Sequence, residues 1–150
     1  MFRKILVVFG FAFLVFAHNT SESKAENMKP LISILNQEQS ASMFVYAFER
    51  CSGLFNALYA RFSNYDKPEY KRIADIMLNE ASISSIGALN SAEAASLNLT
   101  PEKTLEKSLG FAKRYSAHMD RHSQNTGNSV SPFIENDQSL CIELNKLLKN

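Results

Sequence analysis

Residues 44–62, FVYAFERCSGLFNALYARF, decide the fold class because their large apolar side chains recur at helical spacing. The series steps along the chain by four, three, four, three and four residues: Phe44, Phe48, Cys51, Phe55, Leu58 and Phe62. This spacing places the series on one face of an α-helix and predicts that the face is buried. Glu49, Ser52 and Asn56 fall on the opposite side, where we expect solvent.

Prolines mark the starts of three further helices, because proline suits the first turn of a helix and disrupts its interior. Pro101 and Pro132 each follow a hydroxyl residue, Thr100 and Ser131, whose side chain can cap a helix. We therefore expect four long helices, over residues 31 or 36 to 62, 68–89, 101–122 and 132–148.

An acidic pair, Asp66 and Glu69, predicts a variant capping box at the start of the second helix. Residues 90–99 either extend that helix or form a short separate one, and residues 124–131 have the composition of a loop. Apolar faces are predicted for the last three helices. In residues 68–89 the face is Tyr70, Ile73, Ala74, Met77 and Ala81. In residues 101–122 it is Leu105, Leu109, Ala112, Ser116 and Met119, and Phe111 and Tyr115 repeat at helical spacing as well. In residues 132–148 it is Leu140, Cys141, Leu144, Leu147 and Leu148.

The composition supports a single all-α domain. Hydrophobic residues make up 45% and charged residues 21% of the chain, so a buried core is expected rather than disorder. Valine is nearly absent beyond residue 25, where only Val45 and Val130 occur, and no segment alternates in the manner of a strand. We predict a four-helix bundle over residues 26–150.

The first 25 residues have the pattern of a cleaved signal peptide. Arg3 and Lys4 precede an apolar run over residues 5–16, and small residues at Ala17 and Ala25 offer alternative cleavage points. The run is shorter than the ~20 residues that span a bilayer, so no stable membrane span is expected after cleavage. We expect a periplasmic or secreted protein and leave bacterial or eukaryotic origin open.

The expected location outside the cytoplasm predicts how the cysteines pair. Cys51 and Cys141 are the only two in the chain. In an oxidising compartment two thiols of a small domain usually pair, so we predict a disulfide between the first and fourth helices. Redox-active pairs lie closer together in sequence, as in Cys-x-x-Cys.

Two histidines are the best metal-ligand candidates. His118 and His122 are four residues apart on a predicted helix and so share one face, where they could chelate a zinc or copper ion. Met119 stands where a metalloprotease needs a glutamate. The alternative is a pair of solvated histidines near the end of the helix.

Two further features permit ligand binding, each with a structural alternative. Phe44, Phe48, Phe55 and Phe62 could line a pocket for an apolar ligand, although plain core packing accounts for the same spacing. Arg50 and Arg61 could bind a carboxylate or phosphate, but a solvated helix flank is the simpler interpretation.

The pattern of charges and motifs favours a binding role. Sixteen Lys and Arg balance fifteen Asp and Glu, which argues against a nucleic-acid partner. No nucleophile elbow, glycine-rich phosphate loop or haem-attachment motif occurs, so we expect no cofactor, and an enzyme would need a site built from scattered side chains. We predict a non-enzymatic protein that binds a protein partner or protects against stress outside the cytoplasm. The alternative is a small-molecule or metal carrier that uses His118 and His122 or an apolar pocket between helices.

Overall fold

The computed structural model describes residues 28–37 and 40–149, and the predicted signal peptide lies outside them. The described residues form helices joined by loops, with no strand. The helices are α1 (Leu31–Leu35), α2 (Ala41–Ser63), α3 (Pro68–Ala94), α4 (Pro101–Thr126) and α5 (Pro132–Leu148). The prediction of an all-α bundle is confirmed.

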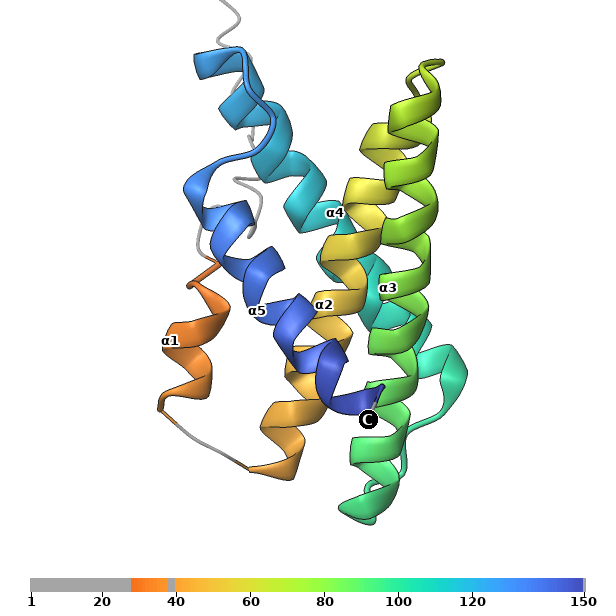
Figure 1. Cartoon of the computed structure of the whole chain (residues 1–150). Coiled ribbons are helices and arrows are strands. Elements are labelled where there is room, and N and C mark those ends of the chain that lie inside the picture. The colour runs from red at the N-terminus through yellow and green to blue at the C-terminus, as the bar shows by residue number, and fades with distance from the viewer. Residues whose placement is uncertain (1–27, 38–39, 150) are drawn as a thin grey trace, which may run out of the picture.

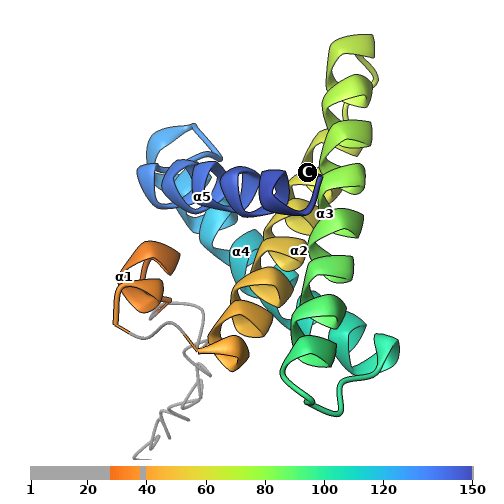
Figure 2. The same ribbon diagram turned by 60° about the horizontal axis from the view of Figure 1, so that its bottom comes forward.

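Helix α2 occupies the centre of the molecule and contacts each of the other four helices. Helices α2 and α3 lie side by side along most of their length, and α4 packs on α2 as well (Figure 1). Helix α5 crosses α2 and α3 at a steep angle, as Figure 2 shows, and α1 packs against both α5 and α2. This central position gives α2 little surface for solvent.

The first long helix that we predicted is divided into two pieces. Helix α1 ends at Leu35, and α2 begins only at Ala41. The hydroxyl of Ser40 accepts a hydrogen bond from the backbone N–H of Met43 at 3.3 Å, which is the geometry of an N-cap. The predicted start at residue 31 or 36 is therefore wrong for α2.

The cap signals of α4 and α5 are confirmed. Thr100 accepts from the N–H of Lys103 at 3.3 Å, and Ser131 accepts from the N–H of Ile134 at 3.4 Å. The predicted capping box at Asp66 is wrong, because the residue before α3 is Lys67 and no side chain caps that helix.

The ends of α3 and α4 lie beyond their predicted positions. Helix α3 continues to Ala94, so the first part of residues 90–99 extends it. Helix α4 continues to Thr126, where Gly127 adopts a left-handed conformation with φ 75°. Glycine tolerates that conformation and ends the helix. Only residues 127–131 of the predicted loop remain outside a helix.

The predicted apolar residues of α4 are confirmed as buried at Phe111, Tyr115 and Met119, and the prediction is wrong at two leucines. Leu105 and Leu109 are 57% and 47% exposed. The buried face consists of Thr104, Ser108, Phe111, Tyr115 and Met119. A side chain at Gly53 of α2 would collide with Phe111 and with the carbonyl oxygen of Ser108, at 2.6 Å. Position 53 therefore needs glycine, because the backbone of α4 approaches α2 too closely there for a Cβ atom.

The aromatic series of α2 forms the core. Phe48 and Phe55 are buried, and Phe44 and Phe62 are partly buried against the same cluster. The core-packing interpretation of this series is thus correct. The predicted solvent face is wrong: Glu49 and Ser52 are buried and Asn56 is half-buried, because neighbouring helices cover α2 on several sides.

Helix α5 is fixed to α2 by a covalent bond. Cys51 and Cys141 form a disulfide, as predicted, with a Cα–Cα distance of 5.4 Å and a sequence separation of 90. Leu147, on the predicted apolar face of α5, is instead 70% exposed. No helix within the described ranges is both long and apolar enough to cross a membrane.

Candidate functional site

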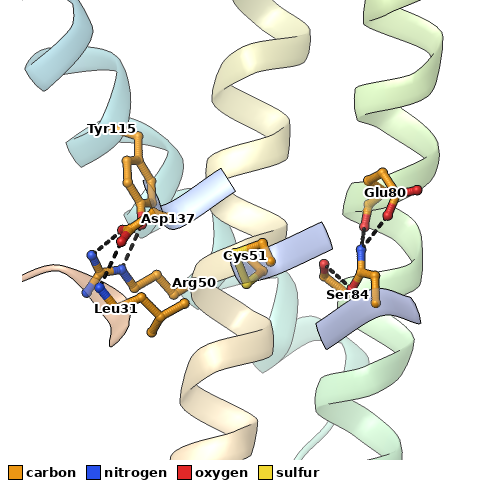
Figure 3. The surroundings of a disulfide bond; sticks show 9 residues. Leu31, Arg50, Cys51, Glu80, Ser84, Tyr115 and Asp137 are labelled. Carbon is orange, nitrogen blue, oxygen red and sulfur yellow. Dashed lines mark hydrogen bonds and ion pairs between the residues drawn. A yellow bond between two sulfur atoms is a disulfide. The ribbon is translucent and has the colours of Figure 1, made fainter. Parts of the chain in front are cut away.

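A buried ion pair joins α2 to α5. The Nη2 atom of Arg50 lies 2.5 Å from Oδ2 of Asp137, and both side chains are almost fully shielded from solvent (Figure 3). The Nε atom of Arg50 donates to the hydroxyl of Tyr115 at 2.7 Å. The interpretation of Arg50 as a solvated flank is therefore wrong.

Asp137 accepts two further hydrogen bonds. The hydroxyl of Tyr115 donates to Oδ2 at 2.6 Å, and the backbone N–H of Leu31 donates to Oδ1 at 2.8 Å (Figure 3). Burial raises the pKa of Tyr115, so this hydroxyl stays protonated and remains a donor. Burial lowers the pKa of Arg50, but the neighbouring Tyr115 and Asp137 raise it more. We call Arg50, Tyr115, Asp137 and the Leu31 backbone the arginine cluster.

A second polar cluster lies on the other side of the disulfide. Asn145 donates from Nδ2 to Oε2 of Glu80 at 2.7 Å and accepts from the hydroxyl of Ser84 at 2.9 Å. Lys149 donates to Oε1 of Glu80 at 2.7 Å. Burial raises the pKa of Glu80, but the hydrogen bonds from Lys149 and Asn145 lower it below its usual value.

These two clusters and the disulfide share one face of α5. Asp137, Cys141 and Asn145 follow at intervals of four residues, which is one face of a helix. Figure 3 shows the disulfide between the two clusters. Every polar group on this face that we have described contacts a partner inside the protein, so the face serves to attach α5.

A different arrangement occupies the groove between α2 and α4. Two adjoining pockets, of about 230 Å³ and 310 Å³, share three lining residues: Tyr46, Glu49 and Lys107. The first pocket is completed by α4 and the second by residues 97–99 of the α3–α4 loop. We call this continuous depression the α2–α4 groove.

Glu49 lies at the base of the groove with an incompletely paired carboxylate. Its side chain is 2% exposed, and Oε1 is 3.3 Å from Nζ of Lys107. That contact is an ion pair without hydrogen-bond geometry, so Oε1 receives no hydrogen bond from any described residue. Burial raises the pKa of Glu49, and the charge of Lys107 offsets part of the rise.

Aromatic and cationic side chains form the walls of the groove. The rings of Tyr46 and Phe111 meet edge to face, with centroids 5.3 Å apart. The guanidinium of Arg114 lies 5.6 Å from the centre of the Phe111 ring. Arg114 is exposed and Lys107 is 55% exposed, so both can turn toward a bound molecule. The charged residues of the lining are thus one buried acid and two accessible bases.

The other predicted site residues lie outside this groove. The rings of His118 and His122 are parallel with centroids 6.4 Å apart, and Nε2 of His118 is 2.8 Å from the hydroxyl of Ser131. Burial lowers the pKa of His118, and Arg121 and His122 lower it further. Within residues 28–37 and 40–149 no three His, Cys, Asp or Glu side chains gather to hold a metal. Arg61 is paired with Asp120 at 2.5 Å.

The groove is not predicted from the sequence, because the helical pattern places Glu49 in solvent. One signal was present: the sequence Glu49-Arg50-Cys51 places two opposite charges beside a core cysteine. Charged residues are rarely buried unless they are paired. A charged residue beside a core position is buried only where a partner of opposite charge is within reach, and the sequence does not show which residue that partner is.

Comparisons of the chain with family models, curated proteins and solved structures give no match.

Proposed function

We propose that the protein is a non-enzymatic binding protein that acts outside the cytoplasm and holds a small organic ligand in the α2–α4 groove. The observation that carries this proposal is Glu49. A buried carboxylate oxygen without a hydrogen bond costs free energy in the unliganded protein. A ligand that donates a hydrogen bond to this oxygen would recover that free energy, which gives the groove a reason to bind.

The lining favours binding over catalysis. Among the side chains that commonly act as nucleophile or general base, the lining residues of the two pockets include one serine, Ser42, and no histidine or cysteine. A hydrolytic site pairs a nucleophile with a general base within hydrogen-bond reach. The groove instead combines an acid, two bases and an aromatic wall, which is the composition of a site that orients a ligand by its charges.

Location outside the cytoplasm is supported by the disulfide, because such bonds persist in oxidising compartments. Intact mass spectrometry of protein from its native host tests this part. We expect a chain without its first 17 or 25 residues whose mass rises on reduction by two hydrogens. A full-length chain with free thiols would contradict export.

Protein-observed NMR tests binding in the groove. We would titrate the mature chain with pooled amino acids, amines, organic acids, sugars and phosphates. The proposal expects chemical-shift changes centred on Tyr46, Glu49 and Phe111 from at least one pool, and their loss in Glu49→Gln. The matched control is Glu106→Gln, which changes an exposed acid on the same helix as Lys107. Shift changes only outside the groove, or none, would contradict the proposal.

Binding of a protein partner is the second candidate. It is favoured by large apolar side chains in solvent on two helices: Ile86 of α3 is 55% exposed and Leu147 of α5 is 70% exposed. Crosslinking in the native compartment tests it with Leu147→Ser and Ile86→Ser. A crosslinked partner that both substitutions leave unchanged would remove these residues from the interface.

A further inference from the structure

We infer that the ligand of the α2–α4 groove is a free α-amino acid with an apolar or aromatic side chain. This inference rests on the proposed function and names the ligand class for the same groove. It follows from how the charges and the apolar walls are placed around Glu49.

The two charges at the base of the groove match the two charges of an α-amino acid. Oε1 of Glu49 and Nζ of Lys107 lie side by side, 3.3 Å apart. An amino acid carries its ammonium and its carboxylate on a single carbon atom, so the two groups also lie side by side. Such a molecule can oppose each of the protein charges with its own opposite charge, in one orientation.

Glu49 would receive the ammonium group. An ammonium has three donors and no acceptor, and it satisfies a buried carboxylate oxygen more fully than a hydroxyl does. Lys107 fills this role only in part, because it is 55% exposed and its contact with Oε1 lacks hydrogen-bond geometry. A bound ammonium would take the place beside Oε1 and release Lys107 for the other end of the ligand.

Lys107 and Arg114 would receive the carboxylate. Both line the same pocket as Glu49, on the side formed by α4. A guanidinium can hold a carboxylate through two parallel hydrogen bonds, and the lysine adds a second positive charge. With one acid and two bases, the groove neutralises both ends of a zwitterion and does not suit a ligand with only a positive charge.

The remaining surface suits an apolar side chain. Tyr46 and Phe111 present rings in the first pocket, and Val45, Leu97 and Leu99 line the second. The second pocket, of about 310 Å³, extends away from Arg114 toward the α3–α4 loop. A leucine or phenylalanine side chain placed against these groups would be removed from water on binding.

Isothermal titration calorimetry with the mature chain tests the inference. The probes are L-leucine and L-phenylalanine, with three matched analogues of phenylalanine: phenethylamine, 3-phenylpropionate and N-acetylphenylalanine. We expect at least one of the two amino acids to bind. Loss of a charged hydrogen bond should weaken binding about 10- to 100-fold, so each analogue of a binding phenylalanine should be weaker by that factor. If only leucine binds, isoamylamine and 4-methylpentanoate replace the aromatic analogues.

Variants assign each charge to its end of the ligand. Glu49→Gln should weaken the amino acid about 10-fold or more and leave the carboxylate analogue unchanged, whereas Arg114→Gln should weaken both. Glu106→Gln should leave all affinities unchanged. Thermal melting of each variant shows whether it is folded.

Two results would overturn the inference. One is an amine or a carboxylate analogue that binds as tightly as the amino acid, because the second charge would then have no role. The other is the absence of amino-acid binding while another pool shifts the groove residues in NMR, which would leave the proposed function standing with a different ligand. If no pool shifts those residues, the proposed function fails as well.

Discussion

Glu49 and Arg50 are neighbours on α2, and both are buried charged residues, but their surroundings differ. Arg50 faces Asp137, a carboxylate as deeply buried as itself, and shares it with Tyr115. Glu49 faces an open groove, and its counter-ion in the structure is the half-exposed Lys107. The charge of Arg50 is balanced by a fully buried partner, and the charge of Glu49 by a partner that remains in contact with solvent.

Under the proposed function, Arg50 is a structural group and Glu49 is a ligand-binding group. Each residue has one buried polar atom without a hydrogen bond, Nη1 of Arg50 and Oε1 of Glu49, so the counter-ions make the difference. An ion pair buried on both sides loses stability when one partner is removed, because the other charge remains buried and uncompensated. The counter-ion of Glu49 is half-exposed and stays solvated when the acid is neutralised, so removing the charge of Glu49 should cost little or even stabilise the fold. Replacing an acid by its amide should therefore lower the free energy of unfolding at Asp137, the partner of Arg50, and leave it unchanged or raise it at Glu49.

The largest effect is expected from Asp137→Asn. It removes the charge that compensates Arg50, and we expect the free energy of unfolding to fall by about 3–5 kcal/mol. Urea denaturation followed by circular dichroism measures the change. The control is Asp120→Asn, at the partly exposed ion pair with Arg61, which should change stability by less than about 1 kcal/mol. Equal losses in the two variants would show that burial of the arginine cluster has no special importance.

The disulfide should contribute next. Replacing Cys51 and Cys141 by serine opens a loop with a sequence separation of 90, and we expect a loss of about 2–5 kcal/mol. The same urea experiment on the double variant measures it. If the disulfide holds α5 against the arginine cluster, the two changes are coupled. The variant that combines both should then lose less unfolding free energy than the sum of the losses from the disulfide variant and from Asp137→Asn. Strict additivity of the two losses would argue that the bond and the cluster act separately.

Tyr115→Phe gives a smaller effect that refines the description of the cluster. The hydroxyl accepts from Arg50 and donates to Asp137, so its removal leaves both with one partner fewer. We expect the free energy of unfolding to fall by about 1–3 kcal/mol, measured by thermal or urea denaturation. Tyr65→Phe serves as the matched control, because that ring is 46% exposed. A loss in Tyr65→Phe equal to that in Tyr115→Phe would contradict a special role for the Tyr115 hydroxyl.

The smallest effect is the pH dependence of stability. The pKa of Glu49 is raised above its usual value of 4.5, so the folded protein binds its proton more tightly than the unfolded chain does. Its contribution is fully present below 4.5 and is lost as the pH rises through the folded pKa. Lys107 and Arg114 of α4 face the same groove, and Lys107 limits the rise. Glu80 has a lowered pKa, so its contribution is present above 4.5 and is lost as the pH falls.

Urea midpoints measured between pH 4 and pH 7 distinguish the two acids. Glu49→Gln should remove a component of stability that declines with rising pH, and Glu80→Gln should remove one that increases. Identical changes in the pH profile from the two variants would contradict the assigned directions.

The parts of the fold that the sequence predicts are those with local chemical causes. Ser131 and Pro132 define the start of α5, and Thr100 and Pro101 define that of α4, because a cap is read from adjacent residues. The disulfide followed from the number of cysteines and the expected compartment. These inferences need no knowledge of how the helices pack.

The misassigned residues depend on packing between helices. Leu105 and Leu109 have helical spacing but lie in solvent, because α4 turns the neighbouring face, with Ser108 and Phe111, toward Gly53 of α2. The sequence predicts Glu49 in solvent because a single apolar stripe implies one buried face. A central helix has several buried faces, and hydrophobic periodicity does not show which helix is central.

The free energy of unfolding of Glu49→Gln, measured by urea denaturation at pH 7, tests the central claim most directly. If Glu49 is a binding group, the variant should be as stable as the unchanged chain or more stable, while Asp137→Asn on the same scale loses about 3–5 kcal/mol. A loss in Glu49→Gln as large as that in Asp137→Asn would contradict the account. Glu49 would then be a structural residue, and the groove would lose its reason to bind a ligand.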